Sequence, residues 1–376
     1  MMKKNTTIAL LATGDELTQG SILNTNAQAI AQALFSHGLE PNWQMAVSDD
    51  VDDMQAALSF LLQRHAVVIT IGGLGPTSDD KTRFALAASL DETLVVHEPS
   101  WDKIKERYQK LNLPVTELAQ QQALFPKKAK ILENANGSAN GCAYAKEEQW
   151  VFMLPGPPRE CLPMFTTDVL PILTQQYATG KILLQWKVFG VAEGMIAEKV
   201  DAVLKPYVSM CRTSFRWNYP YVDCKVLLDE HAPEKAEIIT LLNQLLSPYQ
   251  FDPQNQTATE RLKNFLIDTN MHVLIQDEVT GGVLESRIHV PANHSKISFG
   301  GSSYRSQDSL FFRIEGLENY WAGAGGLESE LVLISQEGTK KFTVPFRSVL
   351  LEIYVAEFIA HQIFLQLIGS ISTNKK

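Results

Sequence analysis

The residues best suited to chemistry lie in one stretch of the chain, from Val67 to Thr82. Its first five residues are all β-branched, which predicts a strand buried on both faces. Gly72, Gly73 and Gly75 follow, and glycine can adopt positive φ and lets a ligand approach the backbone closely. A helix is predicted to begin at Thr82. Because loop N–H groups and a helix N-terminus both attract anions, this order of elements predicts a site for a phosphate or a pyrophosphate.

The same loop ends in two adjacent carboxylates, Asp79 and Asp80, after Pro76 and Thr77. Carboxylates beside a phosphate usually need a divalent cation between them, so the loop predicts a site for Mg²⁺, Mn²⁺ or Co²⁺. A simpler interpretation is a glycine turn in which one aspartate caps the following helix. A Gly-Gly-x-Gly pattern alone is weak evidence, and the prediction therefore rests on the longer run with Pro76, Thr77 and both aspartates.

The elements around this loop should bring further acidic residues beside it. Strands alternate with helices here: the strands are predicted at 6–12, 43–47 and 67–71, and the helices at 27–37, 52–64 and 82–90. This alternation predicts a parallel, doubly wound α/β sheet, in which ligands bind beyond the carboxyl ends of the strands. The aspartates that follow these strands are therefore expected at one edge of the sheet: Asp15, Asp49, Asp79 and Asp80.

A second loop, Pro155-Gly156-Pro157-Pro158, follows an apolar strand predicted at 150–154. This rigid turn places Arg159 at the start of a helix, where a guanidinium could hold an anion. The alternative is an exposed first helical turn formed by Arg159 and Glu160, since charged residues at such positions are mostly solvated.

Composition and charge limit the classes of protein to which this chain can belong. Its 376 residues predict two or three domains, and 45% hydrophobic residues are ordinary for a globular chain. The net charge of −9 argues against a nucleic-acid partner. The apolar helix expected at 349–367 contains Glu352, Glu357 and His361, so we expect it in a core and predict no membrane partner. The four cysteines lack metal-ligand spacing and predict reduced thiols in a cytoplasmic protein.

Several motifs, in order along the chain, are similar to those of the CinA family. They are Ala12 to Leu17, Asn24 to Asn26, Gly72 to Asp80, Asn134 to Gly141 and Leu154 to Pro158, and Phe189 to Glu193 is similar to the family's KH-like module. The resemblance implies an α/β protein with three domains. These are a doubly wound MoaB/MogA-like, molybdopterin-binding fold over 1–172, a small α+β KH-like domain over 173–252 and a C-terminal α/β CinA domain over 258–376.

The resemblance also implies an activity. It implies metal-dependent hydrolysis of the pyrophosphate of ADP-ribose, a nucleoside diphosphate, to AMP and ribose 5-phosphate by a homodimer. The residues expected to hold the metal and position water are Asp49, Asp79 and Asp80. The residues expected to bind substrate and phosphate are Gly14, Asp15, Glu16, Asn26, Gly72, Gly73, Gly75, Pro76, Thr77, Asn134, Gly137, Ser138, Gly156 and Arg159. One alternative is a molybdopterin- or nucleotide-binding protein without turnover, and another is a nicotinamide mononucleotide deamidase.

The C-terminal region departs from the family at the residues that would carry deamidation. The family's Ala-Glu-Ser-Cys-Thr-Gly-Gly segment aligns with Gln276 to Gly282, and Glu278 stands in place of the nucleophilic serine. Ser309 stands where the family has a lysine, in the segment that begins at Ser303. A carboxylate cannot simply replace an alkoxide nucleophile in amide hydrolysis. The resemblance therefore implies a deamidase fold whose activity is lost.

Overall fold

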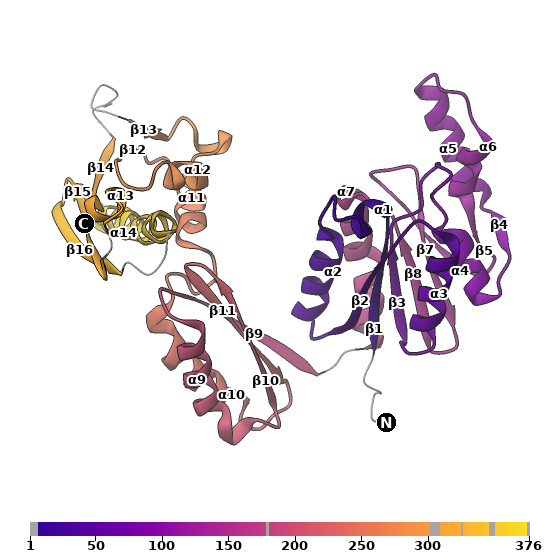
Figure 1. Ribbon diagram of the computed structural model, residues 1–376, viewed down its shortest axis with the longest axis horizontal. Helices are drawn as coiled ribbons and strands as arrows, with labels where there is room; N and C mark the ends of the chain where they lie inside the picture. Colours follow the sequence, from indigo (N-terminus) through magenta and orange to yellow (C-terminus); the bar gives the residue numbers. More distant parts are fainter. Residues whose placement is uncertain (1–6, 178–179, 301–308, 325, 346–349, 374–376) are drawn as a thin grey trace. The chain divides into compact units, whose positions relative to one another are not determined.

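The computed structural model describes residues 7–177, 180–300, 309–324, 326–345 and 350–373. The chain divides into two compact units, which are coloured along the sequence in Figure 1. The first unit comprises Met1–Leu183 with Asp229–His231, and the second comprises Leu184–Leu228 with Ala232–Lys376.

The first unit is built on a six-stranded sheet. Its strands lie in the order β2 (Pro41–Val47), β1 (Ile8–Thr13), β3 (Val67–Ile71), β8 (Gln149–Leu154), β7 (Gly141–Lys146) and β6 (Lys130–Leu132). The pairs from β2 to β8 are parallel, and β7 and β6 continue the sheet antiparallel. Every residue of β1 and β3 is buried, as expected for strands covered on both faces.

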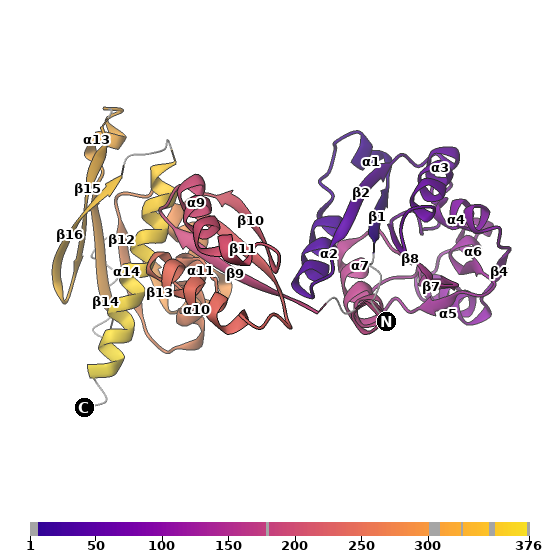
Figure 2. The same ribbon diagram turned by 90° about the horizontal axis from the view of Figure 1, so that it is seen from below.

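Helices cover both faces of this sheet (Figure 2). Ile8 and Leu10 of β1 pack with α2 (Thr25–Ser36) and α7 (Pro158–Met164). Ala9 and Leu11 point to the opposite face and pack with α3 (Val51–Leu62) and α4 (Thr82–Leu90). The prediction of a doubly wound α/β sheet is therefore confirmed.

A segment of mostly short elements lies between α4 and β6. It contains β4 (Leu94–Val96), α5 (Glu98–Lys110), α6 (Glu117–Gln120), the 3₁₀ turn η1 (Gln121–Ala123) and β5 (Leu124–Pro126). Helix α6 ends where η1 begins, and β5 then pairs antiparallel with β4. The side chain of Gln121 in η1 donates to carbonyl groups of the glycine loop, which fixes this turn beside the site.

The second unit contains two sheets. The three-stranded sheet has the order β10 (Cys211–Asn218), β11 (Tyr221–Asp229) and β9 (Lys181–Phe189), with helices α9 (Glu193–Leu204) and α10 (Lys235–Leu246). The five-stranded sheet has the order β13 (Ile297–Phe299), β12 (Val273–Asp277), β14 (Leu310–Gly316), β15 (Glu328–Ser335) and β16 (Gly338–Pro345). Its helices are α11 (Ala258–Asp268), α12 (Val283–Ile288), the short α13 (Glu318–Trp321) and α14 (Leu351–Thr373).

Helix α14 forms much of the core of the second unit. It is long and apolar enough to cross a membrane by length and composition alone. Val355, Ile359 and Ile363 are fully buried in the core with strands of the five-stranded sheet, as expected for a core helix. The four cysteines are all free, in agreement with the prediction of thiols.

A buried carboxylate connects the two sheets of the second unit. Glu357 of α14 is 0% exposed. It accepts hydrogen bonds from the Tyr221 hydroxyl at 2.7 Å, from the backbone N–H and hydroxyl of Thr259 at 3.0 and 2.7 Å, and from Arg287 at 2.6 Å. Since Tyr221 lies in β11 and the other partners lie in α11 and α12, one side chain joins both parts of this unit.

Candidate functional site

A cavity of about 390 Å³ lies at the carboxyl ends of the parallel strands of the first unit. Its position agrees with the rule that ligands of such sheets bind beyond the strand ends. Its described lining residues are Thr13, Gly14, Glu16, Asp49, Gly72, Gly73, Leu74, Gly75, Pro76, Asp79, Asp80, Gln122, Ser138, Ala139, Pro155, Gly156, Pro157 and Glu160. We call this cavity the glycine-loop pocket.

The glycine loop has a backbone that other residues cannot adopt without strain. Gly72 and Gly73 have φ of +105° and +65°. A Cβ atom on Gly72 would lie 2.6 Å from the carbonyl oxygen of Thr13, and one on Gly75 would lie 2.5 Å from the Asp80 carboxylate. Glycine is therefore required for the close approach of β3 to β1 and for the fold of the loop.

Asp80 holds the loop in this shape. One of its carboxylate oxygens accepts hydrogen bonds from the Thr77 backbone N–H at 2.9 Å and from the Thr77 hydroxyl at 2.5 Å. The alternative in which Asp79 or Asp80 caps the following helix is wrong. The N-cap of α4 is Lys81, and no side chain caps it. Thr77 thus positions Asp80, and the loop closes on itself rather than on the helix.

Asp15 and Asp49 are linked reciprocally across two loops. The Asp15 N–H donates to the Asp49 carboxylate at 3.0 Å, and the Asp49 N–H donates to the Asp15 carboxylate at 3.1 Å. Burial raises the pKa of Asp49, and the negative charges of Asp15, Glu16 and Asp79 act in the same direction. By contrast, a hydrogen bond with Thr77 is the main cause that lowers the pKa of exposed Asp79.

The predicted metal ligands lie in one pocket but do not form a metal centre. Asp49, Asp79 and Asp80 all line the glycine-loop pocket. Among the residues that the structure describes, no group of three or more His, Cys, Asp or Glu side chains is arranged to hold a metal ion. The divalent cation thus stays a prediction.

Some of the predicted binding residues line the glycine-loop pocket, and others hold its lining residues in place. Those that line the pocket are Gly14, Glu16, Gly72, Gly73, Gly75, Pro76, Ser138 and Gly156. Two others support it: the Asn26 amide donates to the Gly156 carbonyl at 2.6 Å, and Asn134 donates to the Glu160 carboxylate at 2.8 Å. Asp15 and Thr77 act through Asp49 and Asp80, whereas Gly137 packs against Asn134 and Glu160 outside the lining.

Arg159 is not positioned to hold an anion in this pocket. Its side chain is 79% exposed and lies 3.9 Å from the carboxylate of Glu160. It is outside the pocket lining, whereas its neighbour Glu160 belongs to the lining. The structure agrees with the alternative of a solvated first turn, because nothing buried holds the guanidinium beside the pocket.

Sequence reasoning missed two glutamines. The Gln121 side chain donates to the carbonyl oxygens of Gly75 at 3.1 Å and Thr77 at 2.6 Å. Gln122 is 1% exposed and lines the pocket, and its carbonyl oxygen accepts from the Ser138 hydroxyl at 2.8 Å. Its NH₂ group has no hydrogen-bond partner among the described residues. No sequence signal marks them, because neither glutamine follows a predicted strand.

Arg83 also escaped prediction. It is fully buried, and it donates to the carbonyl oxygens of Leu74 at 2.8 Å and Asn140 at 3.4 Å. Burial lowers its pKa to about 10. A charged residue inside an apolar helix was the available signal, since arginine is almost never fully buried without a specific role. It joins the glycine loop to the loop before β7.

The segment that aligns with the deamidase nucleophile is held by polar contacts. Glu278 lies 3.3 Å from Arg313 and accepts a hydrogen bond from Gln276 at 2.7 Å. Asp277 accepts from the backbone N–H groups of Val279 and Thr280 at 3.0 and 2.9 Å. The Ser309 carbonyl accepts from Gln336, while residues 303–308 of that predicted segment lie outside the described residues. Loss of the deamidase activity stays a prediction.

Comparison with known protein families gives the class of the first domain. The family described as "Probable molybdopterin binding domain" matches residues 9–175. The prediction that this domain hydrolyses ADP-ribose is therefore wrong, since the match is to a molybdopterin-binding domain and the relatives below are not described as hydrolases of ADP-ribose. The predicted classification as a hydrolase is therefore not supported either.

Two solved structures are similar to the first part of the chain. A CinA protein of unknown function from Thermoplasma acidophilum is 29% identical and covers 45% of this chain and 99% of its own, with a TM-score of 0.42. The molybdopterin biosynthesis enzyme MoaB from Thermus thermophilus is 20% identical and covers 46% of this chain and 99% of its own, with a TM-score of 0.30.

Curated relatives match most of the chain. A competence-damage inducible protein from Clostridium botulinum strain Loch Maree is 31% identical over 348 residues, which are 88% of this chain and 82% of that protein. The corresponding protein of Clostridium novyi is 31% identical over 347 residues, 89% of this chain and 82% of its own. This identity extends well beyond the first domain, and the chain belongs to the CinA family of competence-damage inducible proteins, with a MoaB/MogA-like first domain.

Proposed function

We propose that the first domain binds a phosphorylated pterin of the molybdopterin type in the glycine-loop pocket. The observation that carries this proposal is the polarity of the pocket. Its described lining contains five carboxylates and no lysine or arginine: Glu16, Asp49, Asp79, Asp80 and Glu160. Such a wall favours a ligand with many N–H donors and few negative charges.

A pterin ring has these properties. Its amino group and the neighbouring ring N–H form an edge of donors, and ionised carboxylates are acceptors that can take two such bonds. The free NH₂ group of Gln122 offers a donor to a ring nitrogen or carbonyl oxygen. The glycine loop brings backbone to the wall of the same pocket, which suits a single phosphate group.

A diphosphate fits this wall less well. Each further negative charge would meet Asp49, Asp79 and Glu160 within one cavity, where like charges repel more strongly than in water. A divalent cation bound among these carboxylates, as the sequence predicts, would neutralise part of their charge and favour a diphosphate. Carboxylate oxygens are suitable ligands for Mg²⁺, but the described residues do not form a cluster that fits such an ion.

The experiment that tests the proposal is a titration followed by pterin fluorescence. The probes are an oxidised pterin that carries a phosphate, the same pterin without the phosphate, and inorganic phosphate as competitor. We expect saturable binding of the phosphorylated pterin, weaker binding of the free pterin and little competition by phosphate alone.

Two outcomes would count against the proposal or refine it. Absence of binding by the phosphorylated pterin, with and without Mg²⁺, would contradict it. Binding that appears only with Mg²⁺ would support the predicted cation as a part of the complex. Sedimentation of the same sample measures whether the predicted homodimer forms.

A further inference from the structure

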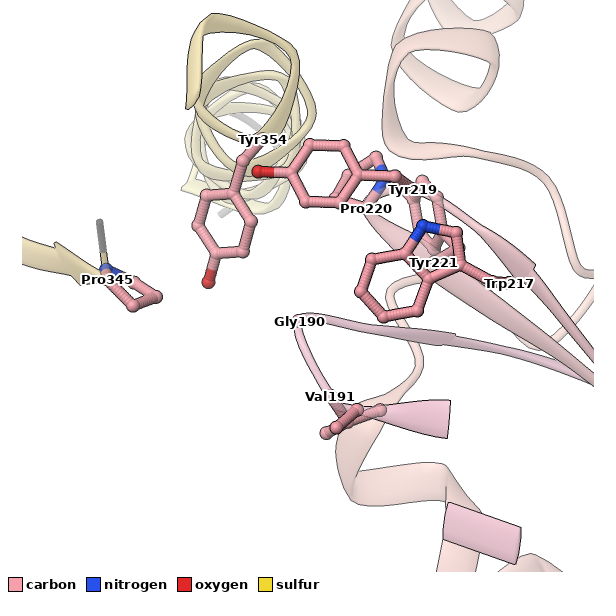
Figure 3. Close-up of a pocket in the computed structure, with 9 residues that line it drawn as sticks. Gly190, Val191, Trp217, Tyr219, Pro220, Tyr221, Pro345 and Tyr354 are labelled. Carbon is pink, nitrogen blue, oxygen red and sulfur yellow. The ribbon is translucent and has the colours of Figure 1, made fainter. Parts of the chain in front are cut away.

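The second unit contains a cavity whose lining shares no residue with the glycine-loop pocket or with the deamidase-like segment Gln276 to Gly282. It has a volume of about 170 Å³ and lies between the three-stranded sheet and the N-terminal end of α14 (Figure 3). Its lining residues are Gly190, Val191, Ala192, Trp217, Tyr219, Pro220, Tyr221, Pro345 and Tyr354. We call it the aromatic pocket. All of its lining residues lie within one compact unit.

Aromatic rings form most of the wall of this pocket. Trp217 is 55% exposed, and its ring stacks beside that of Tyr219, with centroids 6.0 Å apart and planes at 24°. The rings of Tyr221 and Tyr354 rest on Phe189, at 5.3 and 4.5 Å between centroids. Tyr221 and Phe189 are buried, while Trp217 has surface available to a ligand.

A glycine brings the two walls close together. Gly190 has a φ of +69°, and a Cβ atom on it would lie 3.1 Å from the Tyr354 hydroxyl. Its backbone N–H donates to the Pro220 carbonyl at 3.0 Å, which ties the turn after β9 to the turn before β11. The backbone therefore narrows the pocket beside Tyr354, and side chains of Trp217 and Tyr219 close the other side (Figure 3).

Size and charge define what could bind there. A cavity of roughly 150 Å³ lined by apolar side chains holds one benzene molecule, so 170 Å³ accommodates about one aromatic ring. None of the nine described lining residues carries a charge. Aromatic pairs prefer offset stacking or edge-to-face contact at 4.5–7 Å, which gives a ring an advantage over an aliphatic group of the same size.

We propose that the aromatic pocket binds one uncharged planar aromatic ring, whose substituents extend into solvent beside Trp217. This inference goes beyond the proposed function of the first domain and does not depend on it. It gives the protein a second small-molecule site. This site lies in the second unit, whose deamidase residues are replaced. A nucleobase or another uncharged ring attached to a polar group has this chemistry.

The test compares two amides that differ only in aromaticity. Benzamide and cyclohexanecarboxamide are titrated separately into the full chain, and binding is measured by saturation-transfer NMR. Because stacking on the aromatic wall adds to the affinity of a ring, we expect benzamide to bind about five-fold more tightly than cyclohexanecarboxamide. Equal affinity for the two amides, or no binding of benzamide, would overturn the proposal.

Substitution of the exposed ring locates the site. Trp217→Leu should weaken benzamide binding about five-fold, by the loss of the same stacking contact. Trp321→Leu is the matched control, because Trp321 is 54% exposed in the same unit but does not line the pocket. Unchanged binding in Trp217→Leu, or equal losses in both variants, would refute the assignment. A proline-rich peptide that binds while benzamide does not would overturn it in favour of a peptide groove.

Discussion

Asp49 shows at the residue scale how the glycine-loop pocket depends on protonation. Its pKa is raised above 3.8, chiefly by burial, so the folded state favours the protonated carboxyl. The stability that this group contributes is present below about pH 3.8 and is lost as the pH rises through its folded pKa. At neutral pH the ionised group is therefore a cost, and Asp15, Glu16 and Asp79 add to it.

Asp49→Asn should consequently raise the free energy of unfolding at pH 7 and leave it unchanged near pH 3.5. The asparagine keeps a carbonyl oxygen for the Asp15 N–H, so the link between the loops is preserved. Urea denaturation at both pH values measures the difference. Asp102→Asn is a control on the exposed surface of α5, where we expect a change within about 0.5 kcal/mol. A less stable Asp49→Asn protein at pH 7 would contradict the reasoning.

Gln122 gives a second prediction at this scale. Gln122→Met keeps a similar volume but removes the unpaired donor, and we expect the affinity for the phosphorylated pterin to fall about ten-fold. Fluorescence titration measures this loss. Gln109→Met, on the exposed face of α5, is the control. An unchanged affinity in Gln122→Met would show that its NH₂ group does not contact the ligand.

Residues that follow predicted strands were placed correctly from the sequence. Asp49, Asp79 and Asp80 meet because parallel strands end at one edge of a sheet, and that rule needs only the order of elements. Gln122 and Arg83 could not be placed in this way. Gln122 enters the pocket through the excursion between β4 and β5, and Arg83 reaches the loop before β7 from inside α4. Gln122 depends on tertiary packing that no local pattern records, whereas for Arg83 the sequence shows a charge inside an apolar helix but not its partners.

At the scale of elements, the turn after β3 is the most constrained part of the site. Gly72→Ala would place a methyl group against the Thr13 carbonyl at a φ of +105°. We expect a loss of stability of about 2 kcal/mol and a loss of pterin binding. Gly194→Ala is the matched control, because Gly194 lies in the first turn of α9 with open space around it. Thermal unfolding and the pterin titration test both variants.

Long periodic elements were easier to predict than short ones. The helix at 82–90 has the predicted bounds, because it combines a regular apolar pattern with clear end signals. β4 and β5 have three residues each and were not predicted, since so short a run contains no usable period. β15 and β16 form an antiparallel pair with one exposed face, and their polar alternation was not recognised as strand.

At the scale of the whole molecule, the two compact units should respond separately to mutation. Glu357→Gln leaves Arg287 without its charged partner and weakens the hydrogen bonds of Tyr221 and Thr259. Glu357 is fully buried but Arg287 is 35% exposed, so loss of the charge-assisted hydrogen bonds should cost about 2 kcal/mol. Hydrogen exchange should then show lower protection in the second unit and unchanged protection in the first.

The control for this variant is an ion pair on the surface of the same unit. Glu330 and Lys341 lie 3.0 Å apart with both side chains more than half exposed. Glu330→Gln should therefore change stability by less than about 1 kcal/mol. Loss of protection in both units by Glu357→Gln would contradict the division into two units that unfold separately. The three-domain boundaries predicted from the sequence remain a prediction, since the chain divides into two compact units.

The acidic wall of the glycine-loop pocket has a consequence for ionic strength. Salt usually weakens the binding of anions, because it screens attraction to basic side chains. Here the charged side chains of the described lining are all carboxylates, so salt would instead screen their repulsion of the phosphate. With chelator present, raising NaCl from about 0.05 to about 0.5 M should strengthen binding of the phosphorylated pterin and leave the uncharged pterin unaffected. Weaker binding at high salt would reveal positive charge at the site, from a cation that the chelator does not remove, and the protein would then be an anion receptor only when it carries that ion.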